Sequence, residues 1–143
     1  MNVVVQAGWR LELPEALIVQ QHVAADFESG CLARGWIGEA PLTVTVQERQ
    51  LEHGFNEWVR QMTSFWLEAE LPRRIIVSGA TDAVRIDGAI EFDGLGAAGE
   101  RERCIAVYAK RRRRAVVFTI RFRPEDDIGE ALEAIVASFA FVS

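Results

Sequence analysis

Apolar and polar residues alternate along several stretches of this chain, and this alternation constrains the fold more than any other feature. In WRLEL at 9–13, the odd-numbered residues are apolar and the even-numbered ones are charged. The same period of two recurs over 42–46, 84–92 and 116–123. Successive side chains of a β-strand point to opposite sides, so this period is typical of half-buried strands. The chain therefore predicts a sheet with at least one face on a core.

The later strands are predicted to follow one another as an antiparallel meander. The segment 103–109 is mostly apolar, as in a strand buried on both faces. It lies between the alternating segments 84–92 and 116–123, with short turn-like connections on either side. No linker, internal repeat or composition shift interrupts the chain, so we expect a single domain over 1–143.

Two segments carry apolar residues at helical spacing. A long central helix is predicted from Glu48 to Glu70, before Pro72. Its apolar stripe consists of Leu51, Phe55, Trp58, Met62, Phe65, Trp66 and Ala69. A C-terminal helix is predicted after Pro124, with Asp127 as its N-cap and Glu130 completing a capping box. Its buried stripe consists of Ile128, Leu132, Ile135, Val136 and Phe139. An antiparallel sheet flanked by these helices belongs to the α+β class.

The letters GLGAAG at 94–99 match the dinucleotide fingerprint GxGxxG, but their context does not. That chemistry needs a helix to begin at the glycines, so that its amides face a pyrophosphate. The following ERER is charged, and the apolar residues after it are continuous rather than helically spaced. A glycine-rich hairpin loop is the preferred interpretation.

A run of five cations stands out in an otherwise acidic chain. It consists of Lys110, Arg111, Arg112, Arg113 and Arg114. If 103–109 and 115–123 pair, the run is the connecting loop, and a solvated hairpin tip is the preferred interpretation. Without it, the other 11 basic and 21 acidic residues leave a net charge of −10. A positive spot on an acidic body can orient an acidic protein partner, which is the second interpretation. Nucleic acid ranks third, because the body would repel a long duplex.

The tryptophans of the central helix also allow two interpretations. Trp58 and Trp66 flank the apolar stripe, and burial in the core is preferred because a helix on a sheet must cover its apolar side. Exposure of one of them would instead create an apolar patch for a partner. Both are therefore candidate partner-binding residues.

No motif for catalysis, metal binding or a cofactor is present. His22 and His53 lack the company of metal ligands, and no nucleophile elbow or phosphate-binding loop appears. Cys31 and Cys104 belong to no CxxC pattern, so we expect two buried, reduced thiols, with a disulfide as the alternative. The predictions are that there are no catalytic residues, no metal and no cofactor.

The sequence favours a cytoplasmic location without membrane insertion. The N-terminal segment lacks both a basic start and a long apolar run, so no secretory signal is expected. No stretch approaches the ~20 apolar residues of a membrane helix. The net charge of −5 argues against general affinity for nucleic acid or anionic membranes.

The order of these segments resembles the Mog1/PsbP-like superfamily, which includes the DUF1795 (DcrB-like) proteins and the LpqN-type lipoproteins. The resemblance covers nearly the whole chain and rests on GWRLELP, PLTVTVQERQL, VSGATDAVRIDGAIEF, VVFTIRF and the ending ALEAIVASFAFV. It implies an α/β/α sandwich without shared catalytic residues. Its members bind a small GTPase, serve as photosystem subunits or lipoproteins, or act as dimeric chaperones for apolar segments of type VI secretion effectors. The arginine run departs from the family, and a lipoprotein signal is lacking.

The leading hypothesis is a non-enzymatic cytosolic protein-binding domain, an adaptor or chaperone for a partner with an acidic or apolar segment. The alternatives are a small-molecule or lipid carrier that uses the space between helix and sheet, a cryptic enzyme, and a nucleic-acid contact through the arginine run. The alternating strands leave one sheet face rather polar. We expect that face to be incompletely covered or to be covered by a second copy in a homodimer.

Overall fold

The computed structural model describes residues 2–6, 8–20, 24–25, 30–52, 54–64, 68–89 and 100–142. Strands predominate in these ranges, beside two α-helices, α1 (Phe55–Thr63) and α2 (Gly129–Ser138). Every pair of named strands is antiparallel except β4 with β6. The predicted α+β class with an antiparallel sheet is confirmed.

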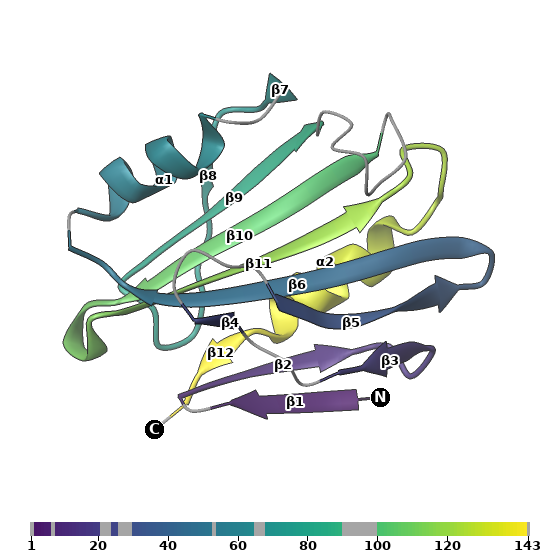
Figure 1. Ribbon diagram of the computed structural model, residues 1–143, viewed down its shortest axis with the longest axis horizontal. Helices are drawn as coiled ribbons and strands as arrows, with labels where there is room; N and C mark the ends of the chain where they lie inside the picture. The colour runs from purple at the N-terminus through teal and green to yellow at the C-terminus, as the bar shows by residue number, and fades with distance from the viewer. Residues whose placement is uncertain are drawn as a thin grey trace.

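Most strands form one large sheet (Figure 1). Its main path runs through β3 (Leu17–Val19), β5 (Gly30–Ile37), β6 (Ala40–Gln50), β11 (Arg114–Phe122), β10 (Arg101–Ala109), β9 (Asp82–Ala89) and β7 (Glu68–Ala69). Off this path, β4 (Ala24–Ala25) pairs with β6 and β8 (Arg73–Arg74) pairs with β9. A smaller sheet has the order β1 (Asn2–Gln6), β2 (Trp9–Leu13) and β12 (Ala140–Phe141).

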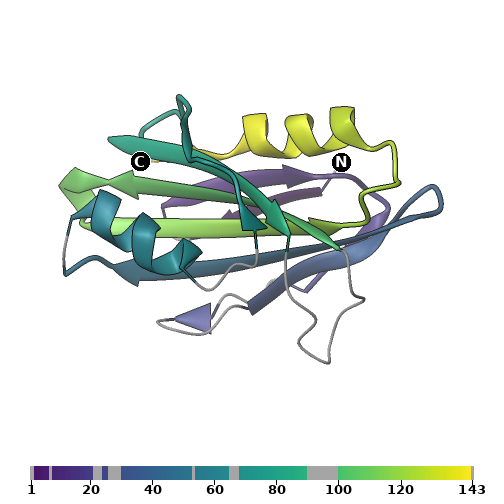
Figure 2. The ribbon, with the colours of Figure 1, turned by 90° about the horizontal axis from the view of Figure 1, so that it is seen from above.

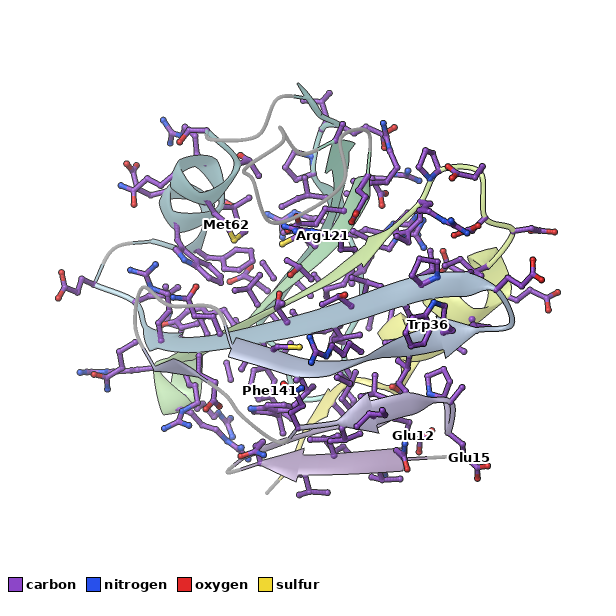
Figure 3. All side chains as sticks on the ribbon, turned by 45° about the vertical axis from the view of Figure 1, so that its right-hand side comes forward. Glu12, Glu15, Trp36, Met62, Arg121 and Phe141 are labelled. Carbon is purple, nitrogen blue, oxygen red and sulfur yellow. The ribbon has the colours of Figure 1, made fainter. Side chains whose placement is uncertain are left out.

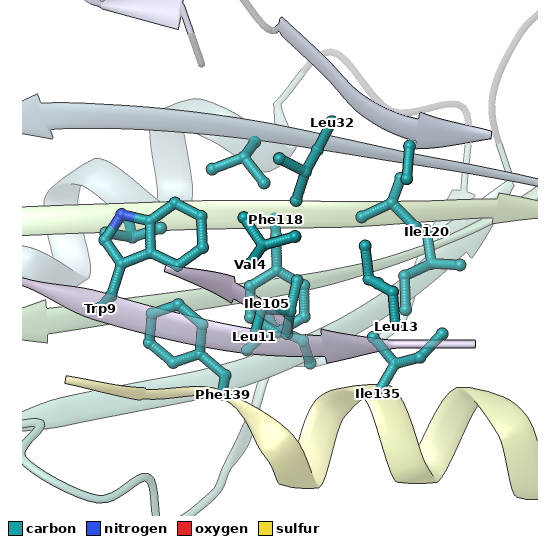
Figure 4. Packing of buried hydrophobic residues seen from close by; sticks show 14 of the residues in the cluster. Val4, Trp9, Leu11, Leu13, Leu32, Ile105, Phe118, Ile120, Ile135 and Phe139 are labelled. Atoms are coloured by element: carbon teal, nitrogen blue, oxygen red, sulfur yellow. The ribbon is translucent and has the colours of Figure 1, made fainter. Parts of the chain in front are cut away.

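The two helices lie on opposite faces of the large sheet (Figure 2). The small sheet and α2 cover one face and enclose the main hydrophobic cluster. Figure 4 shows part of this cluster: Val4, Trp9, Leu11, Leu13, Leu32, Ile105, Phe118, Ile120, Ile135 and Phe139. The ring of Phe139 stacks on Trp9 and on Phe118, with centroid distances of 5.7 and 5.2 Å. A second, smaller cluster lies under α1 on the other face.

The predicted strand alternation is confirmed where the structure describes it. The apolar residues of β2 are fully buried and its charged residues are half-buried. In β6, Leu42, Val44 and Val46 enter the main cluster, whereas the threonines between them point to the opposite face. The middle of β10, residues 104–107, is buried on both faces, as its apolar sequence predicts.

The central helix is shorter than its sequence pattern predicts. Helical spacing extends over 48–70, but α1 has nine residues. Residues 48–50 continue β6, where they pair with 114–116 of β11. The hydrogen bonds of this ladder outweigh the local preference for a helix, so α1 begins only after Gly54. The prediction was wrong for the first turns of the helix and also for its end, because α1 stops at Thr63 and Glu68–Ala69 form β7.

One further local prediction needs correction, and one apolar segment differs from its neighbours. Helix α2 follows Ile128 rather than an Asp127 cap, and no side chain caps it. Its start is set by the buried Ile128, whose carbonyl accepts the Leu132 N–H at 3.0 Å. The apolar segment 74–79 is not a regular strand beyond β8, and Ile76 is 101% exposed. The chain turns toward β12 there, and Phe141 donates its N–H to the Ser78 carbonyl at 3.0 Å.

Neither helix of the described part is long and apolar enough to cross a membrane.

Candidate functional site

The run of five cations forms the end of a hairpin, as predicted. Strands β10 and β11 pair antiparallel, and Ala109 lies opposite Arg114. The connecting turn is therefore 110–113, because Arg114 already belongs to β11. A single 3-10 turn is followed by Arg113 in the left-handed conformation, with φ of 51°. The Arg113 N–H donates to the Lys110 carbonyl at 3.1 Å and closes the turn.

Two of the five cations are tied to the fold. Arg114 lies 3.3 Å from the Glu48 carboxylate, which also accepts a hydrogen bond from the Trp9 indole N–H at 2.6 Å. Arg112 donates from Nη1 to the carbonyl of Gly8, in the turn between β1 and β2, at 2.9 Å. These contacts link the hairpin of β10 and β11, which we call the arginine hairpin, to both sheets.

The other three cations of the turn point into solvent. Lys110, Arg111 and Arg113 are exposed. Within the described ranges, no carboxylate lies at ion-pair distance from any of them. The Lys110 backbone is held from outside the turn, because its N–H donates to the Thr81 hydroxyl at 3.0 Å. The turn is therefore a fixed structure that presents free positive charge.

Trp58 belongs to the core and not to a partner-binding surface. It is 5% exposed and lies in the cluster under α1 with Phe55 and Val59. The rings of Phe55 and Trp58 are 5.7 Å apart. Its proposed role as an exposed contact is corrected, because the helix turns this side chain onto the sheet. Trp66 lies outside the described residues.

The described residues cover the second face of the large sheet only in part, and we call it the open face. Cross-strand pairing places Cys31, Thr45, Thr119, Cys104 and Ile86 in one row on it. Among the described elements, α1 covers the end of this row at Cys104 and Ile86. The threonine part remains polar, and the hydroxyls of Thr45 and Thr119 are hydrogen-bonded to each other. The expectation of an incompletely covered polar face is confirmed for these residues.

A groove of about 290 Å³ runs along this face at the end of α1. It is lined by Thr43, Thr45, Gln47, Met62, Glu102, Cys104, Val117, Thr119 and Arg121. Met62 and Arg121 lie on the same side of the sheet (Figure 3). Arg121 pairs with Glu102 at 3.6 Å. The groove therefore has polar walls with two sulfur-containing side chains at one end.

An apolar hollow of about 400 Å³ continues the open face toward the β3 edge. Its lining residues are Ile18, Arg34, Gly35, Trp36, Pro41, Leu42 and Thr43. Trp36 is 61% exposed and Ile18 69% exposed. Thr43 lines both the hollow and the groove, so the two are contiguous.

Sequence reasoning missed the hollow, although a signal was present. In CLARGWIG, the period of two places Trp36 with Arg34 and opposite the small residues Ala33 and Gly35. Because Trp36 lies on the same face of the strand as the charged Arg34, its ring is expected to be exposed.

The two cysteines are free and too far apart to be bridged. They lie three strand spacings apart in the row described above, which is about 14 Å. A disulfide requires Cα atoms within about 7 Å. Reduced thiols are confirmed and the alternative disulfide is excluded. The predicted burial holds for Cys104 but not for Cys31, which is half-buried.

An ion cluster joins α2 to charged residues of β9 and β10. Asp87 accepts hydrogen bonds from Arg85 at 2.9 Å and Arg103 at 2.8 Å, and both arginines reach Glu133 of α2. Burial favours the neutral form of Asp87, but the two guanidinium groups outweigh it and hold the pKa of Asp87 below its ordinary value. These strand residues point toward α2, which lies over them and leaves them half-buried.

Histidine chemistry cannot be placed, since His22 and His53 lie outside the described residues. In the part of the chain that is described, no group of three or more His, Cys, Asp or Glu side chains is arranged to hold a metal ion. The GLGAAG segment also lies outside it. Its flanking strands β9 and β10 are antiparallel neighbours, however, and 101–109 is strand and not helix. A dinucleotide site of the Rossmann kind needs a helix there.

No known family model and no curated protein matches the chain. The resemblance to the Mog1/PsbP-like superfamily therefore stays a prediction.

Proposed function

We propose that this chain is a non-enzymatic protein-binding domain, an adaptor or chaperone, that binds an apolar segment of a partner protein on its open face. The resemblance to the Mog1/PsbP-like superfamily implies the same class of function. In this proposal the apolar hollow holds the first contact, and the polar groove beside it accommodates the rest of the segment.

The observation that carries the proposal is the exposed pair Trp36 and Ile18 beside a hollow of about 400 Å³. Full burial of one such side chain contributes about 1.5–3 kcal/mol. Covering the exposed parts of both would therefore contribute about 2–4 kcal/mol to an association. Tryptophan is also among the residues that dominate protein interfaces.

A small-molecule or lipid carrier is the second candidate, because the volume of the hollow lies within the usual range for ligand sites. The space between α1 and the sheet is filled by Phe55, Trp58 and Val59. A carried ligand would therefore occupy the hollow. Native mass spectrometry of freshly purified protein separates the candidates, since a carrier retains a ligand mass that the I18S/W36S variant loses.

The direct test is a titration with a dye-labelled, short apolar peptide flanked by serines, in which the dye anisotropy measures binding and the tryptophan emission locates the contact. Contact with the peptide should shift the Trp36 emission to shorter wavelength, and the I18S/W36S variant should bind at least tenfold more weakly. Because other tryptophans also emit, the difference between wild type and W36F isolates the signal of Trp36.

Ile76→Ser is the matched control, because Ile76 is fully exposed but lines a hollow beside α2 on the opposite side of the sheet. It should bind the peptide as the wild type does. Equal weakening by Ile76→Ser and I18S/W36S, or no shift with any apolar peptide, would refute the proposed site.

A further inference from the structure

We infer that the tip of the arginine hairpin, residues 110–113, binds an acidic segment of a protein partner. This site is separate from the apolar hollow. The two lie toward opposite ends of β6, because Gln50 pairs with Arg114 and Pro41 lines the hollow. Nine residue-to-residue steps along the strand separate those positions by about 30 Å.

The tip of the hairpin carries free positive charge. Lys110, Arg111 and Arg113 are exposed, and no described carboxylate neutralises them. Three like charges on one tight turn repel one another, and this repulsion is relieved when an anionic group approaches.

The tip is already ordered before any ligand binds. It is closed by the Arg113 to Lys110 hydrogen bond, held on one side by Thr81 and tied on the other to Gly8 through Arg112. A ligand that binds a fixed turn does not have to order it, and this preserves binding energy. A merely solvated tip has no need of contacts to two other parts of the fold.

The rest of the molecule is strongly negative. Outside the run, 11 basic and 21 acidic residues leave a net charge of −10. A rigid nucleic-acid duplex extends beyond the tip and meets this negative body. Duplex binders commonly neutralise about 6–10 phosphates, whereas this tip has three exposed cations without a described partner. A short acidic protein segment can contact the tip alone, so it fits the observed charges better.

The test measures binding of a dye-labelled, glutamate-rich peptide by fluorescence anisotropy between about 50 and 200 mM NaCl. The wild type should bind it with an affinity that falls as salt rises. R111S/R113S should weaken binding about three- to thirtyfold, the loss expected for two exposed charge pairs. This variant spares Arg112 and Arg114, whose contacts support the fold, and its melting temperature should equal that of the wild type.

The control variant R60S/R73S removes the same charge from two exposed arginines outside the hairpin. It should change the affinity by less than about twofold. Equal weakening by both double variants would overturn the inference, as would a DNA duplex that binds the tip more tightly than the peptide at equal salt. I18S/W36S should leave acidic-peptide binding unchanged, so this inference and the proposed function fail separately.

Discussion

At the scale of single residues, the two cysteines show how position in the sheet sets reactivity. Cys104 is fully buried, and burial together with the nearby Glu102 and Asp87 raises the pKa of its thiol well above the ordinary value. The reactive form of cysteine is the thiolate, so Cys104 should be inert in the folded protein. Cys31 lies in the same row of the sheet but is half-buried, near its edge.

Alkylation should therefore distinguish the two thiols. We expect iodoacetamide to modify Cys31 in the native protein and Cys104 only after unfolding, at a rate lower by a factor of about 10³ or more. Intact mass spectrometry over time measures this, and Cys31→Ser should take up no label while folded. Rapid native labelling of Cys31→Ser would show that Cys104 is accessible.

Asp87 binds both arginines that connect the large sheet to α2. Its carboxylate accepts from Arg85 and Arg103, and Arg73 approaches it at 3.7 Å. Its side chain is only 13% exposed, so these contacts are poorly screened by solvent. Loss of the carboxylate would leave the charges of two half-buried guanidinium groups less well compensated.

Replacing Asp87 by Asn should lower the free energy of unfolding by about 1–3 kcal/mol at neutral pH. The folded pKa of Asp87 lies below its ordinary value. Its contribution is therefore complete above about pH 4 and is lost as the pH falls through the folded pKa. Urea unfolding at neutral and acid pH should show the difference between variant and wild type shrinking in acid.

Asp82→Asn is the control for this prediction, since Asp82 is on the same strand and lies 3.7 Å from Arg74 with 30% of its side chain exposed. Such an exposed pair contributes about 0–1 kcal/mol. If both variants lost equal stability, Asp87 would have no special role.

At the scale of elements, the turn between β1 and β2 supports the arginine hairpin. Gly8 has φ of +94°, a conformation that favours glycine, and a Cβ at this position would lie 2.8 Å from Arg112 Nη1. The missing side chain is what allows the guanidinium group to reach the Gly8 carbonyl. Sequence distance hides this contact, which joins residues 104 positions apart.

Gly8→Ala should therefore lower the melting temperature by about 3–10 °C, because it strains the turn and displaces Arg112. Amide exchange at Arg113 should also accelerate as the hairpin loses its tether. Gly38→Ala is the control, because Gly38 also has a positive φ, of +63°, but open space around it. It should show the strain without the faster exchange at Arg113, and equal exchange in both variants would contradict the role of the tether.

The helices show why some element boundaries escape prediction. Helical spacing over 48–70 is real in the sequence, yet 48–50 join β6 because β11 offers a complete strand partner. A pattern of side chains reports a local preference of a few tenths of a kcal/mol per residue. The local pattern does not show which distant segment will pair with these residues as a neighbouring strand.

At the scale of the whole molecule, the two faces of the large sheet are covered differently. One face is closed by the small sheet and α2 over the main hydrophobic cluster. The open face is covered by α1 at one end and presents the hollow with Trp36 toward the β3 edge. The arginine hairpin lies at the far end of the same strands, so the two proposed contacts do not compete for space.

The sequence by itself determined the α+β class, the alternating strands and the hairpin turn within the run 110–114. These properties follow from the spacing of apolar and polar side chains and from the run of cations between two strand segments, which the local sequence displays. Only the tertiary structure decided that Trp58 is buried, that Trp36 is exposed and that Asp87 lies under α2. Each of these depends on which segment covers which face of the sheet. Which segment covers a face depends on contacts between residues far apart in the sequence, and no local pattern of residues specifies those contacts.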